Sequence, residues 1–95
     1  MILIELNYKV ELPTVEQHTA EHRAWLDEQY QKGLFLLSGP KNPRTGGFIL
    51  ALGNDKLQLE QLIQQDPFYK KQIADYTFTE FITNKCNPLL KDLLS

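Results

Sequence analysis

The chain has 95 residues, of which 42% are hydrophobic, and this size and composition suit one domain with a single small core. Its 10 basic and 12 acidic side chains give a net charge of −2, so it lacks the basic field that holds a nucleic acid. The single cysteine, Cys86, excludes an internal disulfide, and no apolar run approaches the ~20 residues that span a bilayer. We therefore expect a cytoplasmic protein with no nucleic-acid or membrane partner.

The N-terminal segment alternates between apolar and polar residues over 2–10, which is the period of a half-buried strand. Pro13 ends this predicted strand, and Thr14 is the predicted N-cap of a helix over 15–32 that Gly33 closes. At about 100° per residue, one inward face of this helix carries both histidines of the chain. That face consists of Val15, His18, Thr19, His22, Trp25, Leu26, Gln29 and Tyr30.

Two short apolar strands are predicted next, over 34–38 and 46–52, followed by an amphipathic helix over 56–65. Asp66 and Pro67 have the pattern of an N-cap followed by proline at the first helical position, which opens a short third helix. The last predicted strand covers 75–83 and turns Tyr76, Phe78 and Ile82 to one face, before a helical turn that starts at Asn87-Pro88.

The predicted order is β-α-β-β-α-β, which is the ferredoxin-like α+β arrangement of an antiparallel sheet with two helices on one face. We expect one domain over 1–95, with a core over about 1–83 and a C-terminal tail over 84–95. The strands carry apolar residues on both faces, for example Phe48 and Leu50 on one and Ile49 on the other. Because an open apolar sheet face needs cover, we expect dimerisation through the sheets.

His22 is the first candidate for chemistry, because an inward histidine that borders a cleft can transfer a proton near neutral pH. The alternative is a packed histidine that bonds a backbone carbonyl. His18 lies one turn earlier on the same face and completes an H-x-x-E-H pattern with Glu21 and His22. We discount a zinc site, because peptidases with this pattern are much larger and a third ligand must come from elsewhere.

Asp66 is the second candidate, although an aspartate before a proline is a helix cap in its own right. A carboxylate on this cap can also pair with His22, fix its tautomer and raise its basicity. We expect the two side chains to approach within ~3–6 Å at the wall of a pocket. The loop between the second and third strands brings Ser38, Gly39 and Arg44 as candidate contacts to a small anionic substrate, although its glycines also suit tight turns.

An ordered set of short motifs runs through residues 1 to 83. The set comprises His22-Arg-Ala-Trp25-Leu26, Ser38-Gly39-Pro40, Pro43-Arg44-Thr45-Gly46-Gly47 and Asp66-Pro67-Phe68. It resembles the YciI-like (YCII-related) family of small bacterial proteins. The resemblance implies a ferredoxin-like fold paired into a dimeric α/β barrel, with an active-site cleft whose His–Asp pair matches His22 and Asp66.

One branch of this family removes HCl from chlorinated hydroxyquinols by acid–base chemistry. Many members carry an arginine about one turn before the histidine, whereas this chain has His18 and Thr19 there. An anion-binding role of that arginine is therefore not carried over, and His18 or Arg44 is the candidate replacement.

The sequence thus predicts a small enzyme that uses no metal or cofactor and performs elimination or a related lyase step on a small polar or anionic ligand. It is expected to act as a homodimer or a higher homo-oligomer. One alternative is a non-catalytic binding or interaction module on the same scaffold. Another is a structural role for His22 and Asp66, with the function residing in assembly.

Overall fold

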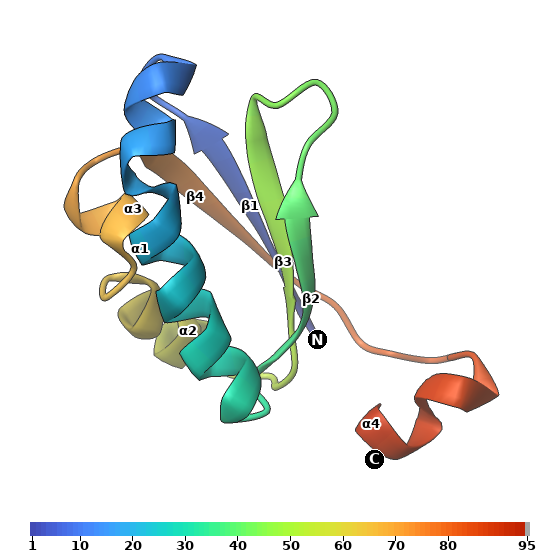
Figure 1. Cartoon of the computed structure of the whole chain (residues 1–95). Coiled ribbons are helices and arrows are strands. Elements are labelled where there is room, and N and C mark those ends of the chain that lie inside the picture. The colour runs from blue at the N-terminus through green and yellow to red at the C-terminus, as the bar shows by residue number, and fades with distance from the viewer. Residues whose placement is uncertain (95) are drawn as a thin grey trace.

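The computed structural model describes residues 1–94, which form one antiparallel sheet with helices (Figure 1). Ser95, the last residue of the predicted tail, lies outside the described residues. The strands are β1 (Ile2–Tyr8), β2 (Phe35–Pro40), β3 (Gly46–Ala51) and β4 (Ala74–Glu80). The helical elements are α1 (Leu12–Gln31), α2 (Lys56–Ile63), α3 (Pro67–Lys70), the 3₁₀ turn η1 (Pro88–Leu90) and α4 (Lys91–Leu94).

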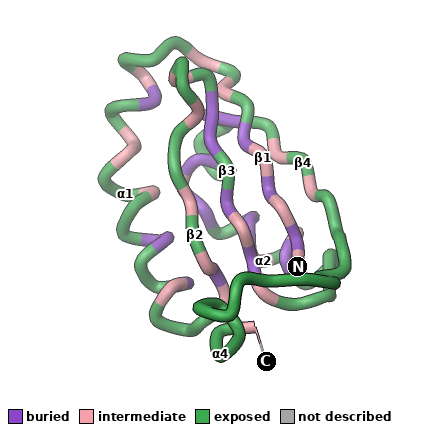
Figure 2. The backbone as a smooth tube through the Cα atoms, turned by 90° about the vertical axis from the view of Figure 1, so that its right-hand side faces the viewer, coloured by how far each residue is buried: buried purple, intermediate pink, exposed green. Residues whose placement is uncertain are grey.

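The strands lie in the order β2-β3-β1-β4, and every neighbouring pair is antiparallel (Figure 2). This order, with α1 between β1 and β2 and with α2 and α3 between β3 and β4, is consistent with the ferredoxin-like arrangement. The predicted α+β fold with an antiparallel sheet is therefore confirmed.

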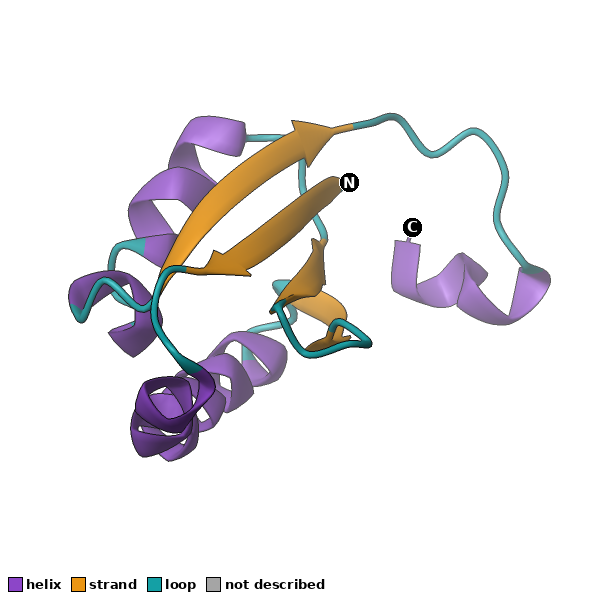
Figure 3. Cartoon of the chain, turned by 90° about the horizontal axis from the view of Figure 1, so that it is seen from above, coloured by secondary structure: helices purple, strands orange, loops and turns teal. Residues whose placement is uncertain are grey.

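The helices α1, α2 and α3 all lie on one side of the sheet (Figure 3). The core fills the space between them, because alternate residues of β1 and β3 point toward the helices. Its sheet side is formed by Ile2, Ile4, Leu6, Ile49 and Ala51, and its helix side includes Val15, Trp25, Leu26, Leu59, Ile63 and Phe68.

The opposite side of the sheet, which we call the open face, has no helix over it (Figure 3). The register places Leu3 opposite Leu50 and Leu50 opposite Leu37, and it places Phe48 opposite Glu5. Leu37 is 54% exposed and Phe48 is 38% exposed. The open face thus carries an apolar patch over β1, β3 and β2.

Gly46 allows β3 to lie close against β1. A Cβ atom at this position would stand 1.8 Å from the carbonyl oxygen of Leu6, a distance that no side chain can occupy. From the sequence, the two glycines that open β3 suited either tight turns or a substrate-binding loop. Gly46 is instead required by close strand packing, because glycine alone leaves that space empty.

The start of α1 differs from the prediction. The helix begins at Leu12 with Glu11 as its N-cap, and Thr14 lies inside the first turn. Pro13 does not separate strand from helix, because a proline in the first helical turn gives up an N–H that has no partner there anyway. The predicted inward face is confirmed, since Val15, Trp25, Leu26 and Gln29 are its buried residues.

The last strand ends earlier than predicted, at Glu80. Tyr76 and Phe78 face the helices and are half-buried, as the alternation indicated. Ile82, which was placed on the same inward face, is 85% exposed because it lies beyond the strand. The helical turn predicted at Asn87 is present, and its side chain accepts a hydrogen bond from the N–H of Leu89 at 2.9 Å.

Candidate functional site

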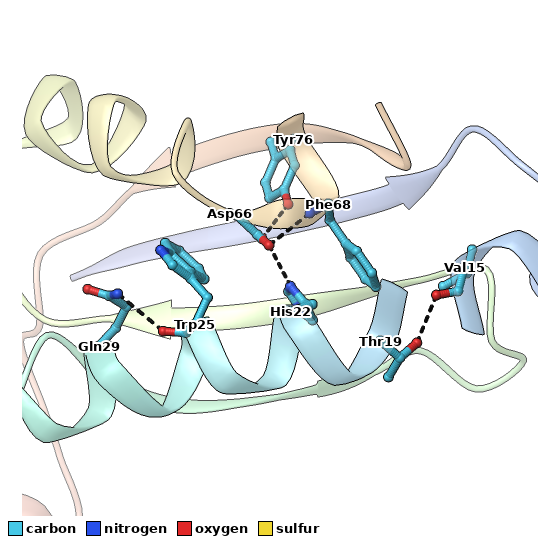
Figure 4. Close-up of polar contacts among 8 residues, drawn as sticks. All are labelled: Val15, Thr19, His22, Trp25, Gln29, Asp66, Phe68 and Tyr76. Carbon is cyan, nitrogen blue, oxygen red and sulfur yellow. Dashed lines mark hydrogen bonds and ion pairs between the residues drawn. The ribbon is translucent and has the colours of Figure 1, made fainter. Parts of the chain in front are cut away.

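His22 and Asp66 meet where α1 packs against the start of α3 (Figure 4). The Nδ1 atom of His22 lies 2.8 Å from Oδ1 of Asp66. The approach expected from the sequence is therefore present, although 44 residues separate the two positions. Only 12% of the His22 side chain is exposed, and the Asp66 side chain is fully buried.

Asp66 is the N-cap of α3, and its carboxylate serves three donors. Oδ1 accepts from the backbone N–H of Phe68 at 3.0 Å as well as from His22, and Oδ2 accepts from the hydroxyl of Tyr76 at 2.5 Å. A buried carboxylate needs such partners, because an unpaired buried charge is costly. The arrangement suits an ionised, acceptor-only group.

Tyr76 is a fixed donor in this arrangement. Burial, followed by the negative charge of Asp66 and the hydrogen bond to it, raises the pKa of Tyr76 far above its usual range. The hydroxyl therefore keeps its proton and donates it to Oδ2. With Tyr76 and Phe68 as donors on Asp66, the neutral imidazole of His22 carries its proton on Nδ1, which leaves Nε2 as the basic nitrogen.

Phe68 fixes the plane of the His22 ring. The two rings are stacked with centroids 3.9 Å apart and planes within 1° of each other. Because Phe68 is also buried and lies in the same short helix that Asp66 caps, α3 supplies both the carboxylate and the stacking ring. The orientation of His22 is thereby set by two independent contacts.

A cleft of about 370 Å³ opens beside this pair, between α1 and the strands β2 and β3. His22 lines the cleft. Asp66 and Tyr76 are not among the lining residues, and the hydrogen bond between Asp66 and His22 links them to the cleft. The polar side chains of the wall are Tyr8, Thr19, His22, Arg23, Asp27, Tyr30, Ser38 and Arg44. The hydroxyls of Tyr30 and Ser38 lie 2.6 Å apart and join α1 to β2 across the cleft.

Arg44 reaches from the β2–β3 loop to α1. Its Nη2 atom donates to Oγ1 of Thr19 at 3.4 Å, and Nη1 lies 3.9 Å from a carboxylate oxygen of Glu16. Within residues 1–94, its Nε atom has no hydrogen-bond partner. The guanidinium therefore stands one turn before His22 on the cleft side, next to Thr19, with donor capacity to spare.

The remaining candidate residues differ in whether they line the cleft. Ser38 and Gly39 line the cleft, whereas His18 is not among its lining residues. The His18 side chain is half-buried, and its Nδ1 atom, 3.8 Å from Oε1 of Glu21, has no hydrogen-bond partner within residues 1–94. In the described part of the chain, no three His, Cys, Asp or Glu side chains come together in a way that holds a metal ion.

Two residues of the site were missed in the sequence. Tyr76 was placed on the inward face of its strand but was given no partner, although an inward tyrosine hydroxyl requires one. Arg23 lies just beyond the inward arc of α1 and was given no role, yet it lines the cleft. The position of Tyr76 along its strand and of Arg23 along its helix was the sequence signal that could have identified them.

Comparisons with known proteins agree with this fold. The family model of the YCII-related domain matches residues 1–82. A solved structure of 5-chloro-2-hydroxyhydroquinone dehydrochlorinase from Burkholderia phenoliruptrix AC1100, in complex with 2,5-dihydroxybenzoquinone, is similar with a TM-score of 0.70. The sequences are 17% identical, and the similarity covers 86% of this chain and 94% of that one. No curated protein sequence matches the chain.

Proposed function

This chain belongs to the YCII-related domain family, and we propose that it is a small-molecule enzyme whose His22–Asp66 pair performs metal-independent acid–base chemistry. The observation that carries the proposal is a fully buried carboxylate on Nδ1 of a histidine that lines a cleft. That arrangement fixes the tautomer and stabilises the imidazolium that forms when Nε2 takes a proton.

The proposed reaction is an elimination. Nε2 of His22 removes a proton from the substrate, and the electron pair of the broken bond forms a new double bond. The leaving group departs with its own bonding pair as an anion. Asp66 stays ionised throughout and balances the charge on His22, while Tyr76 and the N–H of Phe68 hold the carboxylate in place.

The proposed substrate class is a small polar or anionic molecule with a ring or an enolisable carbon. The cleft wall brings the cationic side chains of Arg23 and Arg44 together with the ring of Tyr30, and these two cations outnumber the one carboxylate of the wall, Asp27. The unpartnered Nε of Arg44 favours an anionic oxygen near Thr19. The structurally similar dehydrochlorinase is named for a chlorinated hydroxyquinol, and its solved structure holds 2,5-dihydroxybenzoquinone.

We propose further that two copies pair through their open faces, which gives the dimeric barrel. The apolar patch formed by Leu3, Leu37, Phe48 and Leu50 supports this, because exposed patches of this kind mark interfaces. We place the protein in the cytoplasm, where the free thiol of Cys86 stays reduced.

The function is tested by assaying a panel of chlorinated hydroxyquinols and enolisable acids for chloride release and proton exchange. We expect turnover by the wild type and a loss of at least ~100-fold in His22→Gln, because general acid–base catalysis contributes about that much or more. The matched control is His18→Gln, one turn away on the same helix and outside the cleft, which is expected to keep its activity.

Binding is measured in parallel by calorimetry with 2,5-dihydroxybenzoquinone as the probe. Equal turnover by wild type and His22→Gln would exclude His22 as the base. Binding without turnover across the panel would favour the alternative, a non-catalytic binding module that uses the same cleft. Neither binding nor turnover would favour a structural role for the pair, with the function in assembly.

A further inference from the structure

Residues 81–94, which we call the C-terminal arm, extend away from the rest of the molecule (Figure 1). The chain leaves the sheet after Glu80, runs past its edge, and ends in η1 and α4. The elements η1 and α4 pack mainly against each other. Nearly every residue of the arm is exposed, and only Leu94 is half-buried.

The arm is rich in apolar side chains that its own chain leaves uncovered. Ile82 is 85% exposed, Leu89 is 89% exposed and Leu93 is 57% exposed. Leu89 and Leu93 are four residues apart, so they share one side of the η1–α4 turn together with Leu90. An apolar stripe on an exposed helical turn is the pattern of a surface that packs against something.

The arm lies on the same side of the sheet as the open face and opposite to the helices (Figure 3). It does not cover that face, however, because it crosses only the end of the sheet where the N-terminus lies (Figure 2). A hollow of about 560 Å³ lies there, lined by Met1 and Leu52 from the body and by Lys91 and Leu94 from the arm. The leucines of the tail therefore leave their own sheet uncovered.

We propose that the arm is exchanged between two copies of this chain, so that the apolar stripe of each arm packs on the other copy beside the paired open faces. One chain carries both uncovered apolar surfaces on the same side of the sheet, and within that chain they do not meet. A two-fold axis through facing sheets supplies each surface with its complement, as an isologous interface requires. This inference rests on the proposed pairing of the open faces.

The native Cys86 makes the exchange directly measurable, because it is the single cysteine of the chain and lies exposed in the arm. An excess of chains labelled at Cys86 with a nitroxide is mixed with ¹⁵N-labelled Cys86→Ser chains, so that most ¹⁵N-labelled chains face a nitroxide-labelled partner and any paramagnetic broadening is intermolecular. We expect broadening of amides on the open face, at Leu3, Phe48 and Leu50. The reverse mixture, with label and ¹⁵N on the same dilute chain, is expected to spare them.

The second measurement is the dimer dissociation constant from light scattering on dilution. We expect Leu89→Asp to raise this constant at least tenfold in the full-length chain. The control is Asn84→Asp, which adds the same charge to an exposed arm position off the stripe and is expected to leave it unchanged. Circular dichroism shows whether each variant stays folded.

The two proposals fail in different ways. A dimer whose dissociation constant is the same for wild type and Leu89→Asp, with no intermolecular broadening by the Cys86 label, would overturn arm exchange and leave the sheet pairing intact. A wild-type chain that stays monomeric at all concentrations would overturn both.

Discussion

On the face of the sheet that α1, α2 and α3 cover, the fully buried carboxylate of Asp66 has donors on both oxygens, whereas on the open face the leucines face solvent. The covered face holds a polar group in its core and satisfies it within one chain. The open face and the arm instead carry apolar side chains that stay exposed to solvent within one chain. The difference teaches that one chain builds the candidate site, while the exposed apolar surface is the part for which we propose a second copy.

The largest expected effect is at Asp66. Asp66→Ala removes the acceptor of His22, Tyr76 and a helix N–H at once, and we expect the free energy of unfolding to fall by about 3 kcal/mol or more in urea titrations. The control is Asp55→Ala, another aspartate N-cap, which is exposed and accepts only from the N–H of Gln58. It is expected to cost about 1 kcal/mol. Equal losses would show that the buried contacts add nothing to the cap.

The second effect concerns the open face. We expect Leu37→Asp to convert a particle of about twice the 11.0 kDa chain mass into the monomer in light scattering, because it places a charge in the proposed interface. Leu57→Asp is the matched control, since Leu57 on α2 is 65% exposed but lies on the covered side. A shift in mass with both variants, or with neither, would contradict pairing through the open face.

The third effect is smaller and concerns the hydroxyl of Tyr76. Tyr76→Phe keeps the ring and removes one donor from Asp66, so we expect the free energy of unfolding to fall by about 2 kcal/mol. Tyr69→Phe, at a residue that is 44% exposed, is expected to change it by less than about 0.5 kcal/mol. An unchanged stability of Tyr76→Phe would mean that another donor replaces the hydroxyl.

The same hydroxyl predicts a dependence on alkaline pH. Because folding raises the pKa of Tyr76, the unfolded chain loses this proton near pH 10 while the folded chain keeps it. The stabilisation is complete below about pH 10 and is lost as the pH rises, by about 1.4 kcal/mol per pH unit. The wild type should therefore lose stability above pH 10 more steeply than Tyr76→Phe, and parallel curves would contradict this.

The smallest effect is expected at the polar edge of the open face. Lys9 and Asp75 form an ion pair at 3.5 Å, with 41% and 73% of their side chains exposed. Solvent screens such a pair, so Asp75→Asn should change the free energy of unfolding by less than about 0.5 kcal/mol. A loss above about 1 kcal/mol would show that the Lys9–Asp75 ion pair is more shielded from solvent than it is in a single chain.

The sequence was sufficient for features that depend on periodicity. The alternation over β1 and the 3.6-residue period of α1 predicted the order of the elements and the inward position of His22, because burial follows these periods directly. The Asp66-Pro67 cap was predicted for the same local reason. None of these features depends on distances between elements.

The features that the sequence did not predict depend on how elements meet. The contact of Tyr76 with Asp66 is set by the separation between β4 and α3, which no local pattern encodes. The place of Arg44 beside Thr19 follows from the path of the β2–β3 loop. Ile82 was misplaced because the apolar alternation continues beyond Glu80, the last residue of β4 that pairs with β1.

His22 lies between the α3 cap, which holds its Nδ1 atom, and the cleft that it lines, and this position separates two sets of residues. The groups that hold the proton acceptor in place come from α3 and β4, whereas Tyr30, Ser38 and Arg44 of the cleft wall come from α1, β2 and the β2–β3 loop. Substitutions in the wall alter which molecule fits without disturbing any atom bonded to Asp66. The shape of the cleft and the contacts of the His22–Asp66 pair are thus set by separate parts of the chain.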